Sequence, residues 1–204
     1  MVDEVTGSSE ARERLLDVAE RLFQRRGLAR VTMRDVAEAA GVRQASLYHH
    51  APGGKAQLYR EVFERMIAHH GRGLEAAIRA AGPQLRPRLR AVARWYGGQA
   101  PMHFLRMMTS DMPALGEVEA QALAGPAYAA LMRPITEAFR DAARAGETRA
   151  VDPDLLAGSL LAILDGVAFA ESRAYGAQDR AAMADAMIDV LLDGLVDRSA
   201  ATEV

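Results

Sequence analysis

Residues 32–50, TMRDVAEAAGVRQASLYHH, decide the fold of this chain, because they predict two short helices joined by a tight turn. Thr32 is a favoured N-cap, and Asp35, three residues later, completes a capping box at the start of the first helix. Gly41 stands where a helix ends on a left-handed residue, and Val42 restarts the apolar pattern. Two helices with a short glycine-containing turn are typical of a helix-turn-helix, which places its second helix in the major groove of DNA.

The second predicted helix presents hydrogen-bond donors and aromatic rings, and it has no acidic residue. Its polar side chains are those of Arg43, Gln44, Ser46, Tyr48, His49 and His50. Reading a DNA sequence needs some side chains that reach base edges and others that contact phosphates. Arg43 and Gln44 suit guanine and adenine edges, and Ala45 suits a thymine methyl. For any one of these residues the alternative stays open that its side chain is only solvated.

A wider pattern of residue types at fixed spacing runs from the first helix to residue 55. It comprises Phe23, Gly27, Thr32, V-A-x-x-A-G-V at 36–42, Ser46-Leu47-Tyr48, His50 and Lys55. This pattern resembles the DNA-binding domain of the TetR family of transcriptional regulators. The resemblance implies contacts with the phosphate backbone from Thr32, Tyr48, His50 and Lys55. It also implies a contact between Arg34 and a guanine.

Two positions depart from the family pattern. Family members often have serine or threonine where this chain has Arg43, and this difference bears on base preference. The link 51–54, Ala-Pro-Gly-Gly, is one residue longer than usual, which shifts the point where Lys55 meets the DNA backbone.

The distribution of charge favours the same interpretation. The whole chain carries a net charge of −2, but residues 10–55 hold nine Arg or Lys against six Asp or Glu. The predicted DNA-binding segment therefore has a balance of +3. A basic segment of this kind is the electrostatic footprint of a nucleic-acid partner.

Composition excludes several classes of protein. The chain has 204 residues, half of them apolar, which is enough to bury a core. It has no cysteine, which excludes disulfides, thiol catalysis and thiolate metal sites and suits a reducing cytoplasm. No apolar run approaches the length of a membrane span, and residues 1–14 are polar and acidic, unlike a signal peptide. We expect a soluble, cytoplasmic protein that does not associate with membranes.

Helical periodicity and breaker residues predict an all-α protein. Beside the helix-turn-helix, the predicted helices span 9–26, 55–81, 85–99, 102–111, 117–145, 153–175 and 178–197. The first begins after Ser9, and the fifth kinks near Pro126 or Pro134. We expect residues 9–55 to form a three-helix helix-turn-helix domain to which the helix 55–81 connects. Residues 82–204 then form a larger helical domain for ligand binding and dimerisation.

The last two predicted helices are suited to self-association. Asp152 and Pro153 form a favoured helix start, and both helices carry apolar stripes with small residues between them. The family resemblance implies that the helices 153–175 and 178–197 form a homodimer as a four-helix bundle. The alternative stays open that the same stripes complete an intramolecular core.

Methionine and aromatic residues concentrate in the middle of the chain. They are Trp95, Tyr96, Met102, His103, Phe104, Met107, Met108, Met112, Met132 and Phe139, with Phe169 from a later helix. Helices broken by proline and lined by such adaptable side chains can enclose a pocket, and the resemblance implies an apolar or amphipathic small-molecule effector there. Arg106, Asp111, His103 and Glu137 are candidate orienting contacts. For each of these residues the alternative is ordinary core packing or a solvated surface.

The sequence contains no recognisable metal-binding, cofactor-binding or catalytic motif. The histidines at 49–50 and 69–70 are adjacent, so they point about 100° apart on a helix and do not chelate as an i, i+4 pair does. His49 and His50 fit DNA contact better. The chain has no nucleophile elbow, phosphate-binding glycine loop, HExxH or paired-carboxylate motif. We therefore expect no cofactor, no metal and no catalytic site.

The sequence is compatible with two functions, one that includes sequence-specific DNA binding and one that does not. The resemblance implies a homodimeric, ligand-responsive transcriptional regulator, a repressor that binds a near-palindromic operator in double-stranded DNA and is released by its effector. The alternative is a helical interaction or ligand-binding protein without sequence-specific DNA binding. The composition of residues 43–50 argues against this alternative, because an unused DNA surface need not stay basic, polar and free of acids.

Overall fold

The structure, a computed structural model, describes the backbone of residues 2–100, 102–172 and 180–195 and the side chains of residues 10–100, 102–168 and 182–194. Regular structure in these ranges is helical throughout. The predicted fold class, an all-α protein with an N-terminal helix-turn-helix and a larger helical part, is confirmed.

The chain packs as two compact units. Unit 1 comprises Met1–Ala68 and Arg106–Ala124, and unit 2 comprises His69–Leu105 and Gly125–Val204. These units are defined by packing alone. The division by function, at residues 55 and 82, stays a prediction.

Unit 1 holds the helix-turn-helix. Its elements are α1 (Val2–Arg26), α2 (Met33–Ala40), α3 (Gln44–His50), the first part of α4 (Gly54–Ala80), the π-helical turn η1 (Met107–Asp111), the 3-10 turn η2 (Pro113–Leu115) and most of α7 (Glu117–Ala127). The prediction that the first helix begins after Ser9 is wrong, because α1 already begins at Val2. Residues 2–8 contain no proline, and a serine inside a helix costs little, so nothing forces the helix to begin at Ser9.

One face of α1 forms the core of unit 1. Leu15, Leu16, Ala19 and Phe23 are buried there, at the helical spacing that the sequence predicted. The Phe23 ring meets the Tyr59 ring of α4 edge to face, with 5.2 Å between the ring centroids. α1 also contacts α2, which in turn contacts α3, so this core carries the helix-turn-helix.

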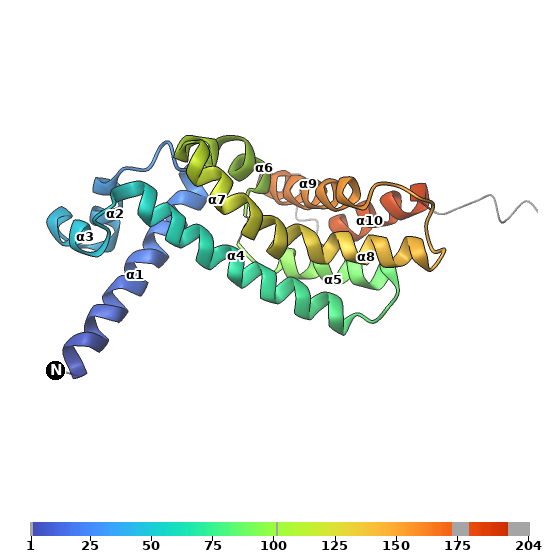
Figure 1. Cartoon of the computed structure of the whole chain (residues 1–204), viewed down its shortest axis with the longest axis horizontal. Helices are drawn as coiled ribbons and strands as arrows, with labels where there is room; N and C mark the ends of the chain where they lie inside the picture. The colour runs from blue at the N-terminus through green and yellow to red at the C-terminus, as the bar shows by residue number, and fades with distance from the viewer. Residues whose placement is uncertain (1, 101, 173–179, 196–204) are drawn as a thin grey trace, which may run out of the picture. The chain divides into compact units, whose positions relative to one another are not determined.

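Unit 2 is a bundle in which α5, α8, α9 and α10 lie side by side (Figure 1). Its elements are the second part of α4, α5 (Leu85–Gly97), the start of α6 (Phe104–Arg106), the π-helical turn η3 (Tyr128–Met132), α8 (Arg133–Arg144), α9 (Pro153–Ser172) and α10 (Arg180–Leu195). Its core includes Leu89, Leu131, Phe139, Leu160 and Ile188, each of which is almost fully buried.

Two π-helical turns interrupt the middle of the chain. Residues 117–144 form α7, η3 and α8, and η3 lies between Pro126 and Pro134, where the sequence predicted a kink. Proline has no N–H to give to the preceding turn, which favours a local change in the hydrogen-bond pattern. The helix predicted over 102–111 is not continuous, because α6 begins at Phe104 and gives way to η1 after Arg106.

The start of α9 agrees with the prediction. Asp152 Oδ1 accepts a hydrogen bond from the Asp154 backbone N–H at 2.9 Å, and Pro153 is the first helical residue. The predicted ends of the last two helices, near residues 175, 178 and 197, lie outside the described residues. No helix within the described ranges is long and apolar enough to cross a membrane.

Candidate DNA-binding surface and effector cavity

The predicted capping box fixes the start of α2. Thr32 Oγ1 accepts a hydrogen bond from the Asp35 backbone N–H at 3.1 Å, and Asp35 Oδ2 accepts one from the Thr32 backbone N–H at 2.8 Å. Hydrogen bonds from Thr32, and then the nearby Arg26 guanidinium, lower the pKa of the Asp35 carboxyl. Thr32 is exposed, but its backbone N–H and its hydroxyl both donate to Asp35 Oδ2. A contact between Thr32 and a phosphate therefore stays a prediction.

Gly41 makes the turn between α2 and α3. Its φ of 67° and ψ of 28° are left-handed values, and its N–H reaches the carbonyl oxygens of Ala37 and Glu38. The Val42 N–H also donates to the Ala37 carbonyl oxygen, at 3.0 Å. A Cβ at position 41 would meet no atom within 4 Å, so the backbone conformation, and not lack of space, favours glycine here.

α3 presents its polar residues outward from one buried anchor, Leu47, which is 0% exposed. The predicted contact residues that are exposed are Arg43, Gln44, Ala45, Ser46, Tyr48 and His49. His50 is half-buried, and its ring meets the His49 ring edge to face. Because α3 contains no acid, its exposed face offers donors and aromatic rings without a negative charge.

Two predicted DNA contacts make hydrogen bonds within unit 1. Arg34 Nε donates to Glu38 Oε1 at 2.8 Å on the exposed face of α2, and this bond raises the pKa of Arg34. The Lys55 ammonium donates to the Leu28 carbonyl oxygen at 3.0 Å. An ammonium has three donors, so Lys55 can hold Leu28 and still contact a phosphate. Arg34 must leave Glu38 before it can reach a base.

Arg106 and Asp111 secure the end of α1. Asp111 is 4% exposed, and its Oδ1 accepts a hydrogen bond from the Leu28 backbone N–H at 2.8 Å. Arg106 donates to the carbonyl oxygens of Phe23 and Gln24, at 3.1 and 2.7 Å, and to Asp111 Oδ2 at 3.3 Å. The sequence marked Arg106 and Asp111 as orienting contacts for a ligand. The structure instead shows them pairing backbone groups that the end of a helix leaves free.

Unit 2 contains a small cavity lined by residues of α5, α9 and α10. Three predicted pocket residues, Tyr96, Met102 and Phe104, line it together with Asp165. Its apolar lining includes Ala93, Gly97, Met102, Leu161, Leu164 and Val167. Its volume is about 20 Å³, which is room for about one water molecule.

Asp165 is the lining residue that the sequence analysis missed. Its Oδ1 and Oδ2 accept hydrogen bonds from the backbone N–H groups of Phe104 and Leu105, both at 3.2 Å. A signal for it exists in the sequence, because Asp165 is an acid within the apolar run LLAILDGVAF of α9. Acids are rarely placed in such a run unless a partner stabilises the carboxylate.

Trp95 and Tyr96 form an aromatic cluster with the histidine pair of α4. The His70 ring stacks on Tyr96 with 5.5 Å between the centroids, and the Trp95 ring lies 5.4 Å from His69. Burial, and then the neighbouring His69, lower the pKa of His70 to about 4, so His70 is neutral at pH 7. His70 Nδ1, Trp95 Nε1 and the Tyr96 hydroxyl are buried, and none has a hydrogen-bond partner within the part of the chain that the structure describes. Buried polar atoms are normally paired, so this cluster needs an explanation.

Four predicted ligand contacts lie away from the cavity lining. Phe139 is 1% exposed and belongs to the core of unit 2, and Met132 is half-buried on η3. Met107 and Met108 lie on η1 in unit 1, where Met107 is buried and Met108 is exposed. The structure thus brings Tyr96, Met102 and Phe104 to one cavity and leaves these four outside it. Ligand contact at the four residues stays a prediction.

Two further predicted ligand contacts are placed differently. His103 has a φ of 53°, a left-handed value that is rare outside glycine, and it stands between the lining residues Met102 and Phe104. The side chain of Phe169 lies outside the described ones. A ligand contact from either residue stays a prediction.

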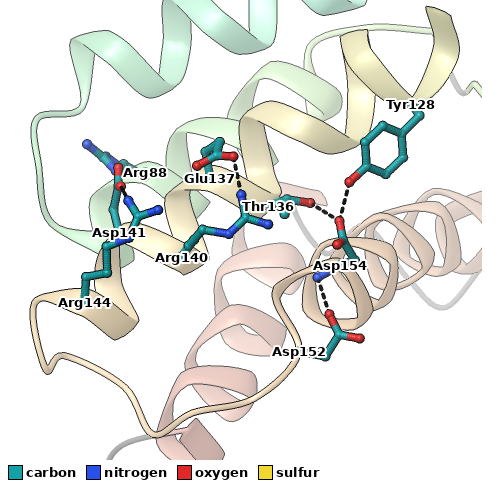
Figure 2. A network of polar contacts seen from close by, with 9 residues as sticks. All are labelled: Arg88, Tyr128, Thr136, Glu137, Arg140, Asp141, Arg144, Asp152 and Asp154. Carbon is teal, nitrogen blue, oxygen red and sulfur yellow. Dashed lines mark hydrogen bonds and ion pairs between the residues drawn. The ribbon is translucent and has the colours of Figure 1, made fainter. Parts of the chain in front are cut away.

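A polar network joins η3, α8 and the start of α9 (Figure 2). Asp154 Oδ1 accepts hydrogen bonds from the Tyr128 hydroxyl and, at 2.9 Å, from Thr136 Oγ1. The bond to Asp154 raises the pKa of the Tyr128 phenol, and both bonds lower the pKa of Asp154. Glu137, which the sequence marked as an orienting contact, instead pairs with Arg140 on the same helix. The network ties the irregular turn η3 to the first turn of α9.

The histidine pairs do not form a metal site in this structure. The rings of His49 and His50, and those of His69 and His70, meet edge to face with centroids 5.7 and 5.6 Å apart. Among the residues whose side chains are described, no three His, Asp or Glu converge as metal ligands do.

The helix-turn-helix segment matches a known family. Residues 15–62, which include α2, α3 and the turn at Gly41, match the model of the bacterial regulatory proteins of the tetR family. This chain carries a TetR-family DNA-binding domain. The family resemblance predicted from residues 23–55 is thereby confirmed.

A relative supports the assignment of the TetR-family domain. The chain is 52% identical, over 48 residues, to the HTH-type transcriptional repressor KstR2 of Rhodococcus jostii (strain RHA1). The match covers 24% of this chain and 24% of the repressor, so the chain spans about a quarter of the length of that relative.

Two solved structures share the fold of this chain over most of its length. A transcriptional regulator from Saccharomonospora viridis, solved in complex with choline, aligns with a TM-score of 0.72 at 24% identity, over 93% of this chain and 100% of its own. AibR, solved with isovaleryl coenzyme A and operator DNA, aligns with a TM-score of 0.73 at 21% identity, over 88% of this chain and 97% of its own. At these identities the likeness shows the fold alone.

Proposed function

We propose that this protein is a ligand-responsive transcriptional repressor, which binds a near-palindromic operator as a homodimer and is released from it by a small-molecule effector. The observation that carries the proposal is the exposed, acid-free face of α3, held by the buried Leu47 and by the turn at Gly41. The repressor named among the relatives supports the direction of regulation. The family consists of transcriptional regulators, so a DNA-binding and not a catalytic role is proposed.

On the proposed DNA-binding surface, some side chains contribute to the affinity for DNA and others to recognition of the base sequence. Gln44, exposed in the first turn of α3, suits an adenine edge in the major groove. Tyr48, 43% exposed, and Lys55 suit phosphates, which fix the helix on the duplex without reading its sequence. Arg43 and Ala45 complete the proposed set of base contacts beside Gln44.

Exposed apolar residues on α9 and α10 support the homodimer. Leu155 is 62% exposed on α9, and Met187 and Val190 are 40% and 68% exposed on α10. Large apolar side chains left in water on two packed helices are typical of a surface that another chain covers. A second copy laying its own α9 and α10 on this surface would form a four-helix bundle with two-fold symmetry. The two α3 helices would then enter successive major grooves, about one helical turn apart.

The cavity in unit 2 supports a response to a small molecule. An effector bound there would favour a conformation in which the two α3 helices no longer match the operator spacing, and DNA would be released because the two states differ in affinity. The choline and isovaleryl coenzyme A complexes of the two structural neighbours support an effector-binding role for this fold.

Selection of duplexes from a random DNA pool by the purified protein tests the proposed function. The wild type should enrich one near-palindromic sequence. Gln44→Ala should change the enriched bases, whereas Tyr48→Ala should weaken binding to every duplex without changing the preference. Arg72→Ala, which removes an exposed arginine of α4 outside the helix-turn-helix, is the matched control and should leave both unchanged. Absence of any enriched sequence would favour an interaction protein without sequence-specific DNA binding.

A further inference from the structure

The cavity in unit 2 has a negative electrostatic character. Among the described residues that line the cavity, Asp165 is the only Asp, Glu, Lys, Arg or His. The neighbouring His70, which stacks on Tyr96, is neutral at pH 7 because its pKa is lowered to about 4 by burial. Burial and the Asp165 charge raise the pKa of the Tyr96 phenol, which therefore keeps its proton. At pH 7 the site thus holds one carboxylate and one neutral hydroxyl.

The Tyr96 hydroxyl lacks a partner. It is buried, and no hydrogen-bond acceptor or donor among the described residues reaches it. A buried hydroxyl left unpaired costs about 1–3 kcal/mol, which an occupant with a polar atom would recover. Because the phenol is protonated, it can donate its hydrogen to an acceptor atom of that occupant.

Asp165 is held rigidly and retains acceptor capacity. Each of its oxygens accepts one backbone N–H, from Phe104 and from Leu105. A carboxylate has about four lone-pair sites, so it can still face a positive charge or a further donor. The rings of Phe104 and Tyr96 add aromatic faces, which attract cations. An anion in the same place would be repelled by the Asp165 charge.

An occupant larger than water would require side chains of the lining to rotate. Its present volume of about 20 Å³ holds about one water molecule. Met102 lines the cavity and has three rotatable side-chain bonds, which lets a methionine adapt to occupants of different shape. Phe104 also lines the cavity, and its ring can rotate about the side-chain bonds.

We propose that this cavity binds a small organic cation, an ammonium group on a short apolar body, with its charge facing Asp165 and a polar atom accepting a hydrogen bond from Tyr96. The proposal deepens and rests on the proposed function, since it names the chemical class of the effector. An anionic ligand such as an acyl thioester fits this cavity poorly, because none of the described lining side chains would neutralise its charge.

A matched set of three probes tests the charge preference in the wild-type protein. Choline carries a quaternary ammonium and a hydroxyl, 3,3-dimethylbutan-1-ol has a carbon in place of the nitrogen, and 3,3-dimethylbutanoate carries a negative charge. Trp95 is the single tryptophan of the chain and neighbours Tyr96, so its fluorescence reports occupancy. Choline should bind at least about tenfold more tightly than either other probe. Equal binding, preference for the alcohol or the anion, or no binding of all three would overturn the proposal.

Variants assign the preference to this cavity. Asp165→Asn should abolish the advantage of choline over the alcohol, and Tyr96→Phe should weaken both, because both offer a hydroxyl oxygen to the phenol. Asp141→Asn, which removes an exposed carboxylate of α8 outside the cavity, is the matched control. If Asp165→Asn unfolds because Phe104 and Leu105 lose an acceptor, Tyr96→Phe and the wild-type probe series still decide the question.

The same preparation separates this inference from the proposed function. Binding of an operator fragment is measured without any probe, and probe binding is measured without DNA. Operator binding without a preference for the cation would overturn only the inference about the ligand. A cation preference without operator binding would contradict only the proposed regulatory function.

Discussion

The Asp111 carboxylate accepts a hydrogen bond at 2.8 Å from the backbone N–H of Leu28, a residue 83 positions earlier in the chain. Leu28 follows the end of α1, and its carbonyl oxygen is held by Lys55. Both polar groups of one backbone position are therefore paired by side chains from distant segments of unit 1. The helix-turn-helix rests on α1, so this pairing bears directly on its stability.

Asp111→Ala should destabilise the protein by about 3 kcal/mol. The substitution leaves the buried Leu28 N–H without an acceptor and the Arg106 guanidinium without its carboxylate. Chemical denaturation measures the change. Glu119→Ala is the control, since it breaks the exposed pair of Arg60 and Glu119 and should cost less than about 1 kcal/mol. Equal effects of the two substitutions would contradict the buried role of Asp111.

Gly73→Ala should destabilise unit 2 although alanine is the better helix former. A Cβ at position 73 would lie 1.9 Å from the Trp95 ring, so Trp95 or the helix would have to shift. Such overpacking costs about 1–3 kcal/mol. Gly166→Ala is the matched control on α9, where a Cβ meets no atom within 4 Å. It should be neutral or stabilising by up to about 1 kcal/mol, and the midpoints of thermal unfolding compare the two. A stabilised Gly73→Ala protein would refute the close approach.

Acid should destabilise the protein through His70. Its pKa is about 4 in the folded chain, against the ordinary value of 6.5. Below pH 6.5 the unfolded chain binds a proton that the folded chain does not, so stability is full above pH 6.5 and falls as the pH approaches 4. The loss amounts to about 3 kcal/mol.

His70→Phe should remove this part of the pH dependence, because phenylalanine fits an aromatic cluster and does not titrate. Denaturation in urea at several pH values between 4 and 7 measures the slope. His49→Gln, at an exposed position of α3, should keep the slope of the wild type. An identical slope in His70→Phe would show that His70 is not the group responsible.

Val190→Glu should convert the proposed dimer into a monomer. Val190 is 68% exposed on α10, in the surface assigned to the second copy, and a buried unpaired carboxylate there is costly. Val118→Glu places the same charge on α7 at a position that is 82% exposed and should leave the dimer intact. Sedimentation velocity gives the mass of each protein. A dimeric Val190→Glu would place the interface elsewhere.

The helix-turn-helix could be predicted because its determinants are local. Thr32 and Asp35 cap α2 across three positions, and Gly41 ends it within the same segment. The Arg106–Asp111 cluster and Asp165 could not be assigned in this way. Asp111 acts on Leu28 from 83 positions away and Asp165 acts on Phe104 from 61, so only the packed chain brings these groups together.

The irregular turn η3 likewise has a feature that depends on nearby residues and a feature that depends on residues distant in the sequence. Pro126 and Pro134 predicted an irregularity, because proline removes a donor whatever surrounds it. That Tyr128 and Thr136 then bond to Asp154 of α9 depends on how the helices pack. α1 begins at Val2 and not after Ser9, because Ser9 can cap a helix but need not do so.

Hydroxyl-radical footprinting of the selected duplex tests the central claim most directly. It would be done with the wild-type protein at a stated salt concentration, because phosphate contacts make affinity strongly dependent on salt. A homodimeric repressor should give two protected half-sites related by a dyad, about one helical turn apart, and Tyr48→Ala should abolish them. Uniform weak protection along the duplex, or protection that survives Tyr48→Ala unchanged, would contradict the claim.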